Sequence, residues 1–143
     1  MAEQADVVFL FDENSPARLV RSLRELGQNA WHVNDLGLRR APDREVLRYA
    51  GERGWVMVSS DRQILHRPHE RAVLKELNMG AFFFNDSIRG LCKIARTTYR
   101  HLPEMKRLAS IQPRPFLHLL RETTITPIRR KSLGSEAQAE TLR

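Results

Sequence analysis

The segment that decides the fold is Asp6-Val-Val-Phe-Leu-Phe11, followed at once by Asp12-Glu-Asn-Ser-Pro16. Its apolar residues form a short, uninterrupted run of aromatic, β-branched and leucine side chains, which predicts a strand buried on both faces. Ser15 and Pro16 are typical of the N-cap and first position of a helix. Leucine and valine then recur at three- and four-residue intervals until Gly27, where we expect the helix to end. The chain therefore begins with a buried strand that leads directly into an amphipathic helix.

The same alternation of strand and helix continues along the chain. We expect further strands at residues 30–33, 55–59, 81–84 and 116–120, and helices at residues 41–53, 69–78, 87–101 and 103–110. This order predicts an α/β protein with three layers, α/β/α, and a central, mostly parallel sheet. The length of 143 residues fits one domain, which we place at residues 1–126. Residues 127–143 lose all periodicity and are predicted to form a polar, flexible C-terminal tail.

Charge is distributed unevenly over the chain. The net charge is +7, from 24 Lys and Arg against 17 Asp and Glu. Residues 1–65 hold nine Arg against ten acids, a net charge of −1, whereas residues 66–143 hold fifteen basic and seven acidic residues, a net charge of +8. The single cysteine, Cys92, excludes an intrachain disulfide. The longest apolar run is much shorter than a membrane-spanning helix, so we expect a cytoplasmic protein with no membrane partner.

Acidic side chains follow two of the expected strands. Asp12 and Glu13 come directly after the first strand, and Asp61 follows the third. Ligands of open parallel α/β sheets bind beyond the carboxyl ends of the strands, and the first turn of the following helix lies at the same edge. Asp43 belongs to such a first turn and shares a helix face with apolar residues, whereas Glu45 shares a face with charged ones. We therefore expect Asp12, Asp43 and Asp61 to lie near one another.

Three neighbouring carboxylates repel one another unless a positive charge lies between them. A hard divalent cation, Mg²⁺ or Mn²⁺, is the usual solution, and such an ion can activate water and stabilise charge on a phosphate. Simpler interpretations stay open at this point. Asp43 can stabilise a helix dipole, and Asp12 and Asp61 can cap turns. Asp35 follows the second strand and could support the site, but turn chemistry explains it equally well.

The order and spacing of these segments resemble a known family. The matching stretches are Val8-Phe-Leu-Phe-Asp-Glu-Asn-Ser-Pro-Ala-Arg-Leu19, Leu26-Gly27, His32-Val-Asn-Asp-Leu-Gly37, Ala41-Pro-Asp-Arg-Glu-Val-Leu47 and Gly54-Trp-Val-Met-Val-Ser-Ser-Asp61. They resemble the PIN-like family of small bacterial proteins, which is similar to the PIN domains of toxin ribonucleases and to the nuclease domain of Mut7-type exonucleases. The resemblance implies a three-layer PIN-like fold, acids that bind Mg²⁺ or Mn²⁺, and metal-dependent cleavage of RNA.

The resemblance also implies roles for individual residues. Asp12 matches the first metal-binding acid, Asp61 matches the acid after the third main strand, and Asp43 stands where a helix acid is expected, with Glu45 as its rival. Asn14 lies where a side chain would hold a water or orient a carboxylate, and Glu13 adjoins it. One departure is Gln63, which stands where many relatives carry another acid and supplies no negative charge for a second metal ion.

The basic half of the sequence supplies candidate phosphate contacts. Arg89, Lys93, Arg96 and Arg100 recur at intervals of four, three and four residues, so on one helix they would form a single stripe without interleaved acids. Arginine binds phosphate through paired hydrogen bonds, so the stripe could track an RNA backbone. A solvated helix face explains the pattern equally well.

The leading hypothesis is a metal-dependent ribonuclease, with RNA as substrate, that acts as the toxin of a toxin–antitoxin pair. Its expected partners are a cognate antitoxin protein and a second copy of the chain in a homodimer. Two alternatives remain. One is a non-catalytic PIN-like module that binds RNA or protein, which Gln63 favours. The other is a receiver-like phosphoacceptor domain, for which Ser87 is only loosely placed and Arg121-Glu-Thr123 lacks the needed lysine.

Overall fold

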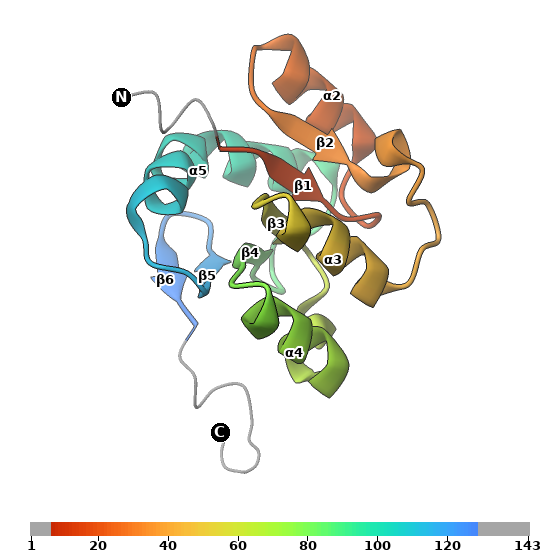
Figure 1. The fold of residues 1–143 in the computed structure, drawn as a ribbon. Helices are drawn as coiled ribbons and strands as arrows, with labels where there is room; N and C mark the ends of the chain where they lie inside the picture. Colours follow the sequence, from red (N-terminus) through yellow and green to blue (C-terminus); the bar gives the residue numbers. More distant parts are fainter. Residues whose placement is uncertain (1–6, 129–143) are drawn as a thin grey trace.

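The computed structural model describes residues 7–128 and shows six strands and four α-helices within them (Figure 1). The strands are β1 (Phe9–Phe11), β2 (Ala30–His32), β3 (Val56–Ser59), β4 (Gly80–Phe84), β5 (Phe116–Leu120) and β6 (Ile125–Pro127). The α-helices are α2 (Ala17–Glu25), α3 (Asp43–Glu52), α4 (Pro68–Glu76) and α5 (Leu91–Ile111). Two short 3₁₀ helices, η1 (Val33–Leu36) and η2 (Arg62–His66), follow β2 and β3.

The strands form one sheet in the order β2-β1-β3-β4-β5-β6. The first five are parallel, and only β6 pairs antiparallel, with β5. The crossover helices therefore return the chain to the same starting edge after each parallel strand, and the carboxyl ends of β1 and β3 lie side by side. The predicted α/β fold with a mostly parallel sheet is confirmed.

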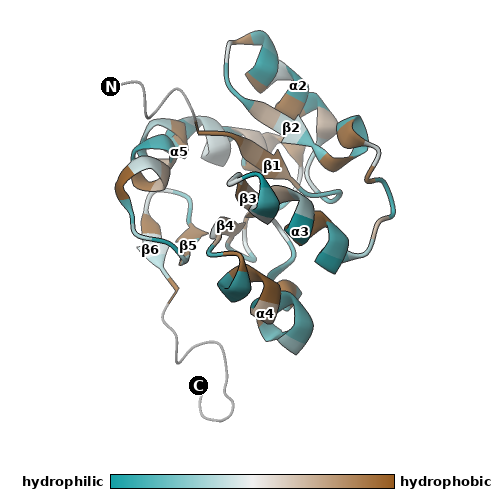
Figure 2. Cartoon of the chain, viewed as in Figure 1, coloured by the Kyte–Doolittle hydropathy of each residue, from teal (hydrophilic) through white to brown (hydrophobic). Residues whose placement is uncertain are grey.

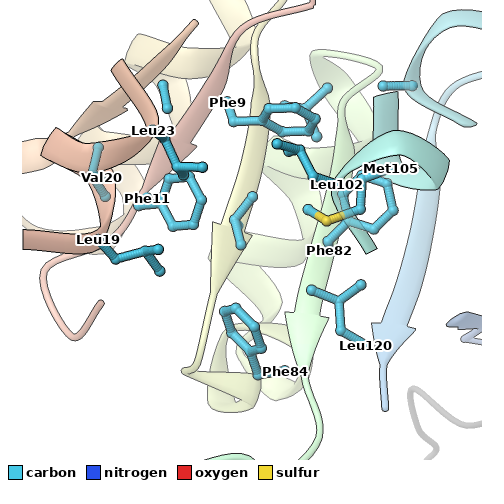
Figure 3. Packing of buried hydrophobic residues seen from close by; sticks show 14 of the residues in the cluster. Phe9, Phe11, Leu19, Val20, Leu23, Phe82, Phe84, Leu102, Met105 and Leu120 are labelled. Atoms are coloured by element: carbon cyan, nitrogen blue, oxygen red, sulfur yellow. The ribbon is translucent and has the colours of Figure 1, made fainter. Parts of the chain in front are cut away.

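The sheet is covered on both faces. Helices α2 and α5 pack on one face, where Phe11, Phe82 and Phe84 are buried (Figure 3). Helices α3 and α4 cover the other face, where Leu10 and Phe83 are buried. Successive strand residues thus point to opposite cores, and burial on both sides explains why the strands lack polar alternation. Figure 2 shows this distribution, with apolar colouring along β1 and hydrophilic colouring over the outer turns of α3 and α4.

The largest departure from the sequence-based prediction is helix α5. We expected a break before Pro103, but α5 runs through Pro103 as one helix of 21 residues. A proline inside a helix loses one backbone hydrogen bond and crowds the preceding turn. Here Leu102 and Met105, on either side of the proline, are both buried against the sheet, so packing stabilises the continuous helix. Helix α5 also begins only at Leu91, so Arg89 lies in the loop before it.

One smaller expectation was wrong, and one strand was not predicted. The N-cap of α2 is Pro16 and not Ser15, whose side chain bonds to Asp12 instead. The sequence also gave no signal for β6, whose three residues pair with β5 and reach Pro127, one residue beyond the expected domain boundary. Most of the tail predicted at residues 127–143 lies outside the described residues. No helix within residues 7–128 is long and apolar enough to cross a membrane.

Candidate functional site

The candidate site lies at the carboxyl ends of β1 and β3. These strands are parallel neighbours, with Phe11 opposite Val58 in the ladder. The Asp12 N–H continues the ladder by donating to the Val58 carbonyl oxygen at 3.2 Å. Asp61 follows β3 after one residue, so strand pairing brings Asp12 and Asp61 to the same edge.

Asp12 is held by two serine hydroxyls. The Ser15 Oγ donates to Asp12 Oδ1 at 2.9 Å, and the Ser59 Oγ donates to Asp12 Oδ2 at 2.5 Å. Burial raises the pKa of the Asp12 carboxyl, these hydrogen bonds lower it, and the negative charge of Asp61 raises it further, with a net upward shift. The carboxylate of Asp12 is therefore positioned tightly in surroundings that disfavour its charge.

Ser59 joins the two strand-end aspartates. It is fully buried, and its Oγ accepts the Asp61 N–H at 2.9 Å while donating to Asp12. Asp61 caps η2 by accepting the Gln63 N–H at 3.0 Å, whereas the Gln63 side chain is exposed. Ser59 was not among the predicted site residues, although a serine as the last residue of a buried strand was a usable signal.

Asp43 reaches the site from the neighbouring helix. It is the first residue of α3, and with Asp12 and Glu13 it lines a small cavity of about 30 Å³. The remaining lining is apolar, from Val33, Ala41, Val46, Leu47, Met57 and Ile64. A cavity of this size is large enough to hold a water molecule. Glu45, the rival of Asp43, is exposed on the outer face of α3.

Arg67 lies against two of the three aspartates. Its Nη1 is 2.6 Å from Asp43 Oδ2 and 3.6 Å from Asp61 Oδ2. Oxygen donors of this kind suit a hard divalent cation. Within residues 7–128, however, no group of three or more His, Cys, Asp or Glu side chains is arranged to hold a metal ion. The carboxylate oxygens are thus chemically suited to Mg²⁺ or Mn²⁺. In this structure, however, Asp43 and Asp61 face the Arg67 guanidinium.

The predicted supporting residues, Glu13, Asn14 and Asp35, lie in different local environments. Asp35 Oδ2 accepts from Arg24 at 2.9 Å and from the His32 N–H at 3.1 Å, so it stabilises the turn after β2. Glu13 Oε1 accepts the Arg40 N–H at 3.2 Å and so holds the loop before α3. Asn14 is exposed in the turn after β1.

The cation stripe begins at the same edge of the sheet as the acids. Parallel strand β4 ends there, and the loop that follows carries Arg89 and leads into the first turn of α5, which carries Lys93. In the folded chain an acid from outside α5 lies beside this stripe, since Glu122 Oε2 is 3.0 Å from Lys93 Nζ. The hydrogen bond from Lys93, together with the charges of Arg96 and Arg100, lowers the pKa of Glu122.

Between the acids and the stripe lies one further ion pair. Arg62, next to Asp61, is 3.5 Å from Asp86 in the loop after β4. This pair connects the loop after β3 with the loop that precedes the stripe. We call Arg89, Lys93, Arg96 and Arg100 the basic surface from here on.

The carboxylates at adjacent strand ends, the third acid on the covering helix and the cations all lie at the edge where open parallel α/β sheets bind their ligands. A family profile described as a PIN like domain matches residues 7–86, which is more than half of the chain. The chain therefore belongs to the PIN-like domain family, and the resemblance noted in the sequence is confirmed. The chain has no significant match among curated proteins or solved structures.

Proposed function

We propose that the protein is a metal-dependent ribonuclease in which Asp12, Asp43 and Asp61 hold Mg²⁺ or Mn²⁺. Membership of the PIN-like family supports a nuclease. The observation that carries the proposal is the position of the Asp12 carboxyl, which lies near Asp61 in buried surroundings. Burial and the charge of Asp61 both raise the pKa of Asp12. Folding alone does not require two acids in this position, and perturbed acids in a concave site are typical of functional centres.

The bound ion would act as a Lewis acid that lowers the pKa of water and offsets negative charge on the phosphate. The protein's own residues position the ligands. Ser59 and Ser15 fix both oxygens of Asp12, and the Ser59 hydroxyl also ties the backbone of Asp61 to the end of β3. The apolar lining of the cavity limits the water around the carboxylates, which strengthens their interaction with a cation.

RNA would bind across the loops after β3 and β4 onto the basic surface. Arg89 and Lys93 lie nearest the edge that carries the acids, and Arg96 and Arg100 continue along α5. All four are charged side chains that can contact phosphate without reading sequence. This arrangement supports a single-stranded substrate that follows the basic surface toward Asp61.

Cleavage of a mixed RNA pool with Mn²⁺ tests the proposal. The wild type is compared with an Asp12→Ala/Asp61→Ala double variant. The matched control is Glu52→Ala/Glu76→Ala, which removes the same charge from two exposed acids at the C-terminal ends of α3 and α4, away from the cavity. We expect the first double variant to cleave about 100-fold more slowly or less, and the control to cleave like the wild type. Equal cleavage by all three proteins, or none by any across metals and RNAs, contradicts the assignment.

A second candidate is a non-catalytic PIN-like module that binds RNA. The exposed amide of Gln63 and the contact of Arg67 with two of the acids favour it. RNA cleavage distinguishes the two candidates. A non-catalytic module would bind RNA on the basic surface but would not cleave it with any metal.

A further inference from the structure

Arg67 is the cation that faces two of the acids, Asp43 and Asp61. It precedes Pro68, the first residue of α4, and its backbone is the N-cap of that helix. From this position a single nitrogen, Nη1, contacts Asp43 Oδ2 and approaches Asp61 Oδ2. One guanidinium therefore neutralises an acid on α3 and an acid after β3 at once. It is the kind of charge that the repulsion between these carboxylates requires.

Arg67 is held much less firmly than Asp12. Its side chain and that of Asp43 are each 43% exposed. Ion pairs with this exposure contribute little to stability, since water solvates both partners well after separation. Asp12, by contrast, is fixed by two serine hydroxyls. The guanidinium can therefore leave the site into solvent while Asp12 and the strand ends stay in place.

We propose that Arg67 is a resident counter-ion that competes with the divalent cation for Asp43 and Asp61, and that the cation enters only as the guanidinium swings out. This inference rests on the proposed function, because it concerns the same carboxylates. It assigns Arg67 as a positioning residue that holds the two acids in the metal-free chain. The cation and the guanidinium would compete because each would be held by the carboxylates of Asp43 and Asp61.

The competition predicts the direction in which the metal affinity changes when Arg67 is replaced. A residue that merely supported the fold of the site would weaken metal binding when removed. A competing counter-ion does the opposite, because its removal frees two ligands and leaves their repulsion uncompensated until the metal binds. Arg67→Met should therefore raise the affinity for Mn²⁺, and Arg67→Lys, which keeps the charge, should lie near the wild type.

Mn²⁺ binding to the full chain without RNA is measured by the loss of the free-ion signal in electron paramagnetic resonance. The matched control is Arg48→Met. Arg48 is 42% exposed and pairs with Glu76 at 3.4 Å on the outside of α3 and α4, so the change in net charge and the loss of an ion pair are equivalent. We expect Arg67→Met to bind Mn²⁺ about 3- to 10-fold more tightly than both the wild type and Arg48→Met. Asp12→Asn should abolish this binding in either background.

A second measurement needs no variant. In the wild type, Mg²⁺ should shift the side-chain nitrogen resonances of Arg67 toward those of a solvated guanidinium. Unchanged resonances at saturating Mg²⁺ overturn the inference, as does an Arg67→Met affinity no higher than that of Arg48→Met. If Mn²⁺ still binds in an Asp12-dependent way in those cases, the proposed metal site survives and only the competition fails. If no variant binds Mn²⁺, both proposals fail.

Discussion

The acidic sheet edge and the basic surface differ in how their charged side chains are held. Asp12 is fixed through both carboxylate oxygens, and Ser59 ties it to the backbone of Asp61. Arg96 and Arg100 project from the exposed face of α5. A group that holds a metal must be positioned closely, whereas a cation that attracts a flexible phosphate chain acts over several ångströms. Under the proposed function, the acids would set the place of the chemistry and the cations would set the strength of RNA binding.

Each region also contains one residue of the opposite sign from a distant part of the chain. Arg67 lies against Asp43 and Asp61, and Glu122 lies against Lys93. Both are partly exposed, and each partly neutralises the region it contacts. The two regions are therefore less strongly charged in the folded protein than the sequence suggests.

The largest effect is expected from Ser59→Ala. The change removes a hydroxyl donor from Asp12 and leaves the Asp61 N–H without its acceptor, so it should lower the free energy of unfolding by about 1–3 kcal/mol. Denaturant titration measures it. Ser110→Ala is the control, because its hydroxyl only bonds back to the Lys106 carbonyl of its own helix, and it should change stability by less than about 0.5 kcal/mol. Equal losses in the two variants would contradict the linking role of Ser59.

Arg96→Gln/Arg100→Gln should weaken binding of single-stranded RNA by about 10-fold at moderate salt without altering the thermal midpoint. If both cations contact phosphates, the slope of log affinity against log salt should fall by about 1.4. Fluorescence anisotropy over a salt series measures both quantities. Arg44→Gln/Arg53→Gln, on the opposite helical layer, is the matched control, and the same loss there would indicate a general charge effect.

Asp12→Asn should stabilise the protein by about 1 kcal/mol at neutral pH while removing cleavage. The amide can keep both serine hydrogen bonds, because each hydroxyl can turn to donate or accept. Since the folded pKa of Asp12 lies above its ordinary value of 3.8, the folded state binds more protons, and wild-type stability falls as the pH rises from about 4 through that pKa. The advantage of Asp12→Asn should therefore vanish near pH 3.5 and grow toward pH 7. Denaturant titrations at several pH values test this, and a constant difference would contradict it.

The smallest effect is expected from Glu122→Gln. The change releases Lys93 from its ion pair and removes a charge that repels phosphate, so RNA affinity should rise by about two- to threefold. Glu76→Gln also removes a half-exposed acid from an ion pair but lies on α4, and it should leave the affinity unchanged. If Glu122→Gln weakens binding, Glu122 orders the basic surface rather than neutralising it.

Much of this architecture could be predicted because it depends on local patterns. Short, largely apolar runs predicted the five parallel strands, and the positions of Asp12 and Asp61 after two of them placed both acids at one edge. The helix face of Asp43 was also predicted correctly, since the apolar positions four and seven residues later, Leu47 and Ala50, are buried. These features follow from residues close in sequence. The break at Pro103 was predicted on the same local grounds and was wrong, because packing of the helix on the sheet outweighs one lost hydrogen bond.

The sequence by itself determined which elements form, which family the chain belongs to and which acids reach the edge of the sheet. Only the tertiary structure decided what those acids touch. Arg67 is 24 residues from Asp43, and Ser59 is 47 residues from Asp12, so neither contact follows from helix or strand periodicity. They arise because β1 and β3 pair as neighbours and the loop after β3 folds back onto the start of α3. Strand order brings distant side chains within hydrogen-bond range, and it is set by how the two cores pack on the sheet.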